Sequence, residues 1–156
     1  MKLLKLKNQK GFTLIELLVV IGILAVLLAI TLIAINPARQ FAQANNTKRR
    51  SDVNAILNAV NQYMADNKGS LPAGITTTAQ EISNTKANIC TALVPQYIAA
   101  LPADPKVNNG ASVTDCAAVA GYVTGYDIVQ SAANNRITVS VETGNQELGD
   151  AISVTR

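Results

Sequence analysis

The sequence predicts an α+β protein: a long N-terminal helix, apolar in its first half, whose second half packs against a small antiparallel sheet of about three strands. Three observations lead to this fold class. A predominantly apolar run extends from Phe12 to Ile35, and apolar residues then recur at spacings of three and four to about Asp66. Near the C-terminus, segments 122–130 and 136–143 are rich in strand-forming residues.

The N-terminal apolar run is long enough to cross a membrane. As a helix, the stretch from Phe12 to Ile35 would be about 36 Å long, against a bilayer core of about 30 Å. A secretory signal fits less well, since its apolar region spans only about 7 to 15 residues. The positive-inside rule keeps the N-terminus in the cytoplasm and places the rest outside, because four lysines precede the run: Lys2, Lys5, Lys7 and Lys10.

Glu16 is a carboxylate inside this apolar run. Burial of an ionised carboxylate costs several kcal/mol unless a cation meets it or it takes up a proton. Thr13, three residues earlier, offers a second explanation, because this spacing is typical of a capping box at a helix start. Both interpretations of Glu16 stay open, and they are compatible.

The segment from Gly11 to Leu17, preceded by Lys10, resembles the processing site of type IV prepilins and of the related pseudopilins of type II secretion systems. The resemblance implies the type IV pilin fold. It also implies that a prepilin peptidase cleaves between Gly11 and Phe12 and that the new amine of Phe12 is methylated. Glu16 would then pair with the Phe12 amine of a neighbouring subunit and set the register of assembly, since a slip would leave two unpaired charges.

The same resemblance implies partners and a location. The precursor would be a single-pass protein of the cytoplasmic membrane, with its N-terminus inside and its head outside. The mature chain would then enter an extracellular homopolymeric filament. An inner-membrane platform protein and an assembly ATPase would drive this step.

After the membrane span, the helical pattern is interrupted and then resumes. Asn36-Pro37 predicts a kink or an unwound turn, because proline lacks a backbone donor and disfavours a helical residue before it. The boundaries we expect are a cleaved leader at 1–11, a membrane or filament-core helix at 12–36 and an amphipathic helix at 37–67. The apolar face of the second helix would comprise Ala38, Phe41, Ala42, Val53, Ile56, Leu57, Val60 and Met64.

A basic cluster, Lys48-Arg49-Arg50, interrupts this face. Its simplest interpretation is a ring of solvated or subunit-contacting charges. A specific phosphate or DNA contact is a weaker alternative.

The remaining residues, 68–156, would form the head, with loops to about residue 121 and the sheet in 122–156. Segment 70–88 is rich in Ser, Thr, Gly, Ala and Asn and predicts a connecting loop, and 91–100 could form a short helix. Segment 97–105, which ends in Leu-Pro-Ala-Asp-Pro, resembles the loop between helix and sheet in major pseudopilins and short pilins. The segments 122–130 and 136–143 predict a hairpin, and 151–155 a possible third strand.

The two cysteines, Cys90 and Cys116, fall on the side expected to be outside the cytoplasm, where disulfides persist. We therefore expect a bridge between them, worth roughly 3 to 4 kcal/mol by loop-closure entropy. Two unpaired buried thiols are the alternative.

Composition argues against an enzyme and against a nucleic-acid partner. The chain has no histidine or tryptophan, and its acidic residues are scattered, so the sequence shows no metal-ligand spacing and no nucleophile with a histidine base. Of 13 basic residues four lie in the leader, which leaves nine against 10 acidic residues. We expect no cofactor. A calcium site remains a weak alternative, since the late acidic residues form no convincing cage: Asp127, Glu142, Glu147 and Asp150.

These observations predict a structural subunit, a major pilin of a type IV pilus. The alternative within the same family is a type II secretion pseudopilin that forms a periplasmic pseudopilus. An alternative of another class is a minor tip pilin that acts as an adhesin or a DNA-binding module. Roles in motility, adhesion, DNA uptake and secretion are all compatible with the sequence.

Overall fold

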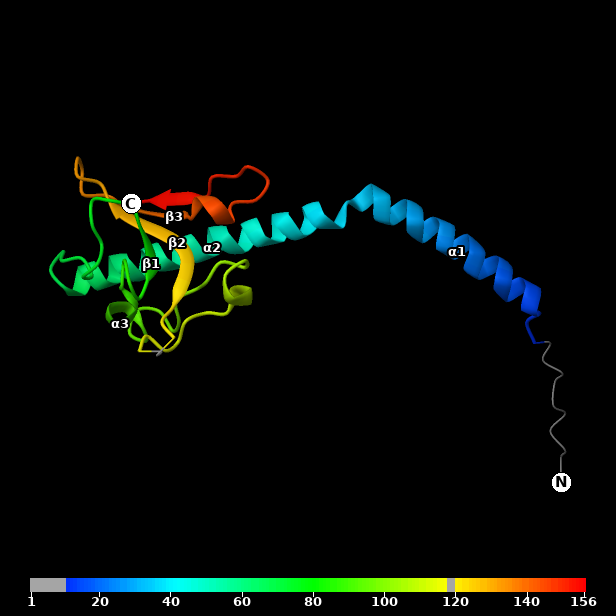
Figure 1. Ribbon diagram of the computed structural model, residues 1–156, viewed down its shortest axis with the longest axis horizontal. Helices are drawn as coiled ribbons and strands as arrows, with labels where there is room; N and C mark the ends of the chain where they lie inside the picture. The colour runs from blue at the N-terminus through cyan, green and yellow to red at the C-terminus, as the bar shows by residue number, and fades with distance from the viewer. Residues whose placement is uncertain (1–10, 118–119) are drawn as a thin grey trace, which may run out of the picture. The chain divides into compact units, whose positions relative to one another are not determined.

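A computed structural model describes residues 11–117 and 120–156 of the chain (Figure 1). The first ten residues of the expected leader lie outside the described residues. The chain divides after Gln40 into two compact units, which are described in turn.

The first unit contains helix α1, Leu14–Ile35, 22 residues long. Thr13 is its N-cap, and Asn36 ends it in the left-handed conformation, with φ 46° and ψ 79°. By length and composition α1 is able to cross a membrane. Its side chains are apolar on all sides, and α1 buries no residue against the described part of the chain. Such a helix is stable only when lipid or other apolar surfaces surround it.

Helix α2, Pro37–Asp66, begins immediately after the break. Proline suits the first helical position, where its missing N–H has no partner to lose. The Asn36 side chain accepts a hydrogen bond from the backbone N–H of Arg39 at 3.4 Å. At the other end Gly69, with φ 85°, donates its N–H to the carbonyl of Met64 at 2.8 Å.

The sheet of the second unit has four antiparallel strands in the order β1-β2-β3-β4. Their bounds are Gln80–Ser83, Val123–Gln130, Ile137–Val141 and Ser153–Thr155. The hairpin of β2 and β3 and the third strand, β4, are confirmed. The expectation of about three strands was one short, because β1 lies in the segment predicted as a loop. This strand has only four residues, and its paired burial pattern lacks the alternation by which strands are predicted.

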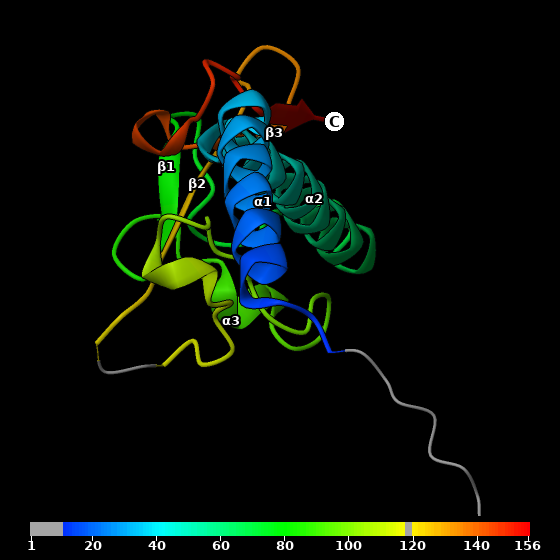
Figure 2. The same ribbon diagram turned by 90° about the vertical axis from the view of Figure 1, so that its right-hand side faces the viewer.

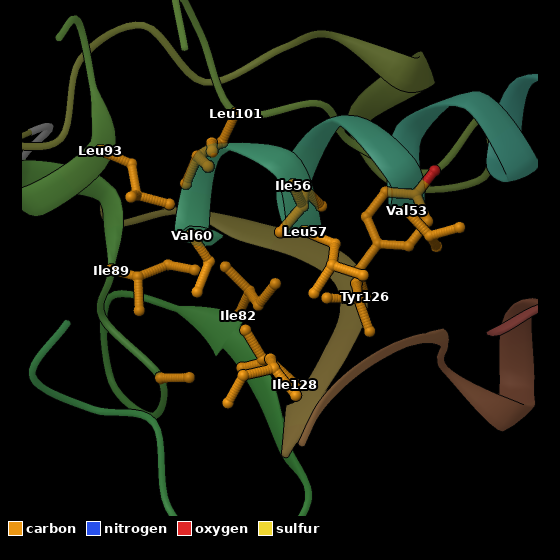
Figure 3. Close-up of a cluster of buried hydrophobic side chains, with 14 of the residues drawn as sticks. Val53, Ile56, Leu57, Val60, Ile82, Ile89, Leu93, Leu101, Tyr126 and Ile128 are labelled. Carbon is orange, nitrogen blue, oxygen red and sulfur yellow. The ribbon is translucent and has the colours of Figure 1, made fainter. Parts of the chain in front are cut away.

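One face of α2 packs on this sheet to form the core (Figure 3). Val53, Ile56, Leu57 and Val60 are buried on the helix. They pack with side chains from the sheet and the loops: Ile82, Ile89, Leu93, Leu101, Tyr126, Ile128, Ile137, Val139 and Val141. Strand β2 crosses α2 in the view of Figure 1, and strands β1 and β2 lie beside α2 in the perpendicular view of Figure 2.

The N-terminal part of the predicted apolar face does not join the core. Phe41 is 71% exposed and Ala38 is exposed too, whereas burial on α2 begins at Asn46. Spacing placed Phe41 on the core face, but full burial of α2 side chains beneath the sheet and loops of the head begins only at Asn46. Phe41 is therefore an exposed aromatic side chain.

Helix α3, Cys90–Leu93, is shorter than the helix predicted at 91–100. Pro95 explains the difference, because it has no N–H to donate and pushes Val94 into an extended conformation, with ψ 135°. Two short 3₁₀ turns, Asn108–Gly110 and Thr143–Asn145, complete the secondary structure of the described residues.

Candidate functional site

The start of α1 carries the residues that the leader motif singles out. Gly11 and Phe12 precede the helix, and the Phe12 side chain is 85% exposed. The carboxylate of Glu16 accepts a hydrogen bond from the Thr13 N–H at 2.8 Å and one from the Thr13 hydroxyl at 2.6 Å. Thr13 Oγ1 in turn accepts from the Glu16 N–H at 3.3 Å. In the single chain Glu16 therefore forms the capping box, which leaves it exposed to a further donor.

The disulfide joins Cys90, at the start of α3, to Cys116, with 5.5 Å between their Cα atoms and a sequence separation of 26. The loop it closes contains the Leu-Pro-Ala-Asp-Pro segment. Leu101 and Asp104 of this segment are both 0% exposed. Backbone hydrogen bonds hold it in place, from Leu101 to Val113 and from the Asp104 N–H to the carbonyl of Thr124.

Arg49 is fully buried beneath this loop, so the interpretation of Lys48-Arg49-Arg50 as a solvated or subunit-contacting ring is wrong for Arg49. Its guanidinium donates to both carboxylate oxygens of Asp104, at 2.6 and 3.1 Å. It also donates to Glu147 at 2.6 Å and to the side-chain oxygen of Asn46 at 2.8 Å. One buried cation thus joins α2, the Leu-Pro-Ala-Asp-Pro loop and the loop before β4.

The charges of this network stabilise one another. Burial alone would lower the pKa of Arg49, but its hydrogen bonds to Asp104 and Glu147 raise that pKa above its usual value. Partial burial would raise the pKa of Glu147, but hydrogen bonds from Arg49 and Asn45 lower it below its usual value. Lys106 lies 3.6 Å from the other carboxylate oxygen of Glu147. Arg49 and Glu147 therefore both stay charged near neutral pH.

The neighbouring Lys48 extends the network. Its ammonium donates to Asp52 and to the carbonyl of Ala103, each at 2.7 Å. The hydroxyl of Tyr126 donates to the same Asp52 oxygen at 2.7 Å. Burial of Tyr126 and its hydrogen bond to Asp52 raise the pKa of the phenol.

Arg50 is the exposed member of the basic cluster. It pairs with Asp150 at 3.0 Å, and the side chains of the two residues are 59% and 45% exposed. A pair this open to water contributes little to stability.

Three comparisons with known proteins bear on these observations. The family model described as the prokaryotic N-terminal methylation motif matches residues 6–32. A relative of 33% identity over 89 residues is the type IV wide pilus major component PilA4 of Thermus thermophilus. The alignment covers 57% of this chain and 66% of that protein, so the chain spans slightly less than two thirds of the relative's length. No solved structure matches the chain.

The comparisons support the type IV pilin family for this chain. The methylation motif covers Gly11, Phe12 and Glu16, the residues on which the resemblance depended, and the long apolar helix with its α+β head agrees with the pilin fold. The structure separates the candidate functional residues into two groups. Gly11, Phe12 and Glu16 belong to the first unit, and the disulfide and the Arg49 network belong to the second.

Sequence reasoning missed the Arg49 network, although one signal pointed to it. Counted back from Val53 in steps of four and three, Arg49 and Asn46 fall on the buried face of α2. A charged residue at a core position requires a partner in the interior. Its partners were not predictable, because Asp104 and Glu147 lie 55 and 98 residues away in the sequence.

Two of the four late acidic residues considered for calcium are paired with arginines. Glu147 pairs with Arg49, and Asp150 accepts from Asn46 and Arg50. Asp127 and Glu142 lie near Glu81, and burial together with these acidic neighbours raises the pKa of both. Over residues 11–117 and 120–156, no three acidic or cysteine side chains gather in a way that could hold a metal ion.

Proposed function

We propose that this pilin is the major structural subunit of an extracellular type IV pilus and has no enzymatic activity. The observation that carries the proposal is helix α1, which is apolar around its whole circumference and uncovered by the described part of its own chain. The name of the Thermus relative, a pilus major component, supports the same assignment.

In this proposal the apolar surface of α1 is buried first in lipid and later against other copies of the chain. Its exposed leucine, isoleucine and valine side chains each gain roughly 1.5 to 3 kcal/mol when they leave water. Lipid provides this gain to the precursor in the cytoplasmic membrane, and the α1 helices of neighbouring copies provide it in the filament. Because the two gains are similar, apolar burial alone does not drive extraction from the membrane, and an assembly ATPase acting through an inner-membrane platform protein supplies the work.

Processing at Gly11 is the step that makes assembly specific. A prepilin peptidase removes the leader on the cytoplasmic side, and the freed amine of Phe12 is methylated. Glu16 is exposed and accepts only from Thr13 within the described residues, so its carboxylate can still meet the Phe12 ammonium of a neighbouring copy. Away from water both charges are tolerated only as a pair, which fixes the axial register between copies.

Fibres sheared from the surface of cells that make the chain test this proposal. Mass spectrometry should find this chain as the main protein of the fibres, beginning at a methylated Phe12. An intact leader would contradict processing, and a chain found in fibres only in traces would indicate a minor tip subunit.

A type II secretion pseudopilin is the second candidate, favoured by the Leu-Pro-Ala-Asp-Pro loop, which resembles that of major pseudopilins. Its Asp104 is buried and holds Arg49. Deletion of the chain distinguishes the two functions. Loss of surface fibres supports the pilus, whereas a secretion defect in cells that still make their fibres supports the pseudopilus.

A further inference from the structure

The loop before β4 makes an unusual turn. The Asp150 N–H donates to the carbonyl of Glu147 at 3.1 Å, and the two residues between them, Leu148 and Gly149, both have positive φ, 58° and 74°. This is the pattern of a type I′ turn, whose first central position favours Asn, Asp or Gly. Leucine is disfavoured there, because its Cβ crowds the backbone in the left-handed conformation.

Leu148 gains no burial in return for this strain. Its side chain is 51% exposed and lies outside the core of the head. Strained backbone positions cluster at functional sites, so an exposed apolar residue in one of them points to a contact outside its own chain.

The network around Arg49 holds this turn in place. Glu147 is fixed by Arg49, and Asn46 donates both to the Glu147 carbonyl and to the Asp150 carboxylate, each at 3.1 Å. Both ends of the turn are thus tied to α2. Leu148 is presented at a defined position and does not move freely on a loose loop.

Phe41 lies on the same side of α2. It is one helical turn before Asn45, whose side chain donates to Glu147 at 3.0 Å. In the second unit the exposed large apolar side chains of the described residues are Phe41, Val123 and Leu148. We call Phe41 and Leu148 the apolar patch of the head.

We propose that the apolar patch docks on helix α1 of a second copy of this chain. The chemistry matches, because α1 is apolar on every side and needs cover, and Glu16 is its one ionisable group. The acids beside Leu148 add no net charge to the patch, since Glu147 pairs with Arg49 and Asp150 with Arg50. The inference rests on the proposed function, because polymerisation is what brings α1 of one copy to the head of another.

Two substitutions at Leu148 separate contact from strain. Leu148→Asn restores the favoured Asn-Gly turn and removes the apolar side chain, whereas Leu148→Met keeps an apolar side chain in the same strained position. In the full-length chain we expect Leu148→Asn to raise the melting temperature of the detergent-solubilised subunit by a few degrees and to reduce its yield in sheared fibres about ten-fold or more. Leu148→Met and the control Val123→Thr should assemble within about two-fold of wild type.

Fibres of Leu148→Asn at the wild-type yield, or a lower melting temperature of that variant, would overturn the inference. If the wild-type chain itself enters no polymer, the proposed function fails and the inference with it. Normal wild-type fibres with normal Leu148→Asn assembly overturn the inference alone.

The partner is identified by a photoreactive benzoylphenylalanine placed at position 148. In intact fibres it should cross-link to a peptide from 14–35 of another copy, and in detergent-solubilised monomers this product should be absent. A product with any other segment or any other protein would overturn the assignment of α1.

Discussion

Removal of the Arg49 guanidinium tests the buried network most sharply. The change Arg49→Met keeps a long side chain but leaves the Asp104 carboxylate, 0% exposed, without its cation. Asp104 would retain a hydrogen bond from the Lys106 N–H at 2.8 Å, which does not neutralise its charge. Loss of one partner of a buried ion pair costs about 3 to 5 kcal/mol.

The expected loss of stability is large enough to measure in the full-length chain in detergent. At about 4 °C per kcal/mol for a domain of this size, the melting temperature should fall by roughly 12 to 20 °C. Thermal unfolding followed by circular dichroism, with urea unfolding as a second measure, gives the value. Arg50→Met is the matched control, and because its pair is exposed it should cost less than about 1 kcal/mol.

A double variant then separates pairing from packing. Arg49→Met combined with Asp104→Leu removes the fully buried carboxylate together with its cation, and Glu147, whose side chain is 20% exposed, keeps Lys106 as a partner. The double variant should be more stable than Arg49→Met alone, because a buried ion pair replaced by apolar residues often costs little. The reasoning is refuted if Arg49→Met costs no more than Arg50→Met, or if the double variant is less stable than the single one.

Three further predictions follow from the head. Because hydrogen bonds from Arg49 and Asn45 lower the pKa of Glu147, the Glu147 carboxylate stabilises the folded head above the unfolded pKa of about 4.3, and this stabilisation disappears as pH falls through the folded pKa. Glu147→Gln should therefore lower the free energy of unfolding by about 1 kcal/mol at pH 7 and by almost nothing near pH 3. An equal loss at both pH values would contradict this. Reduction of the Cys90–Cys116 disulfide should cost roughly 3 to 4 kcal/mol, measured by urea unfolding with and without dithiothreitol, and an unchanged midpoint would show that it does not constrain the unfolded chain. Because Glu147 and Asp150 already pair with Arg49 and Arg50, excess EDTA should leave the melting temperature of the chain unchanged. A clear drop would reveal a divalent cation in the head.

Periodicity made the helices and the hairpin of this protein predictable. The alternation of Ile137, Val139 and Val141 is visible in the sequence, and all three side chains are buried. Asn36-Pro37 likewise marks the point between α1 and α2, since proline restricts the residue before it. These signals are local, so a single sequence carries them.

The features that escaped prediction depend on contacts between distant segments. Strand β1 is short and half polar, and its pairing with β2 defines it more than its own residues do. From the sequence alone Arg49 is expected to be a surface charge, because its partners Asp104 and Glu147 are brought to it only by the fold. Phe41 shows the converse, because an apolar residue at helical spacing is exposed where the sheet and loops of the head do not cover it.

The central claim is that copies of this chain bury one another's α1 helices in a polymer. A cryo-electron microscopy map of fibres sheared from cells tests it directly. We predict a core of packed α1 helices, with the Phe12 amine of each copy beside Glu16 of a neighbour. A fibre with α1 on its outside, or with Glu16 far from every Phe12 amine, would contradict the account.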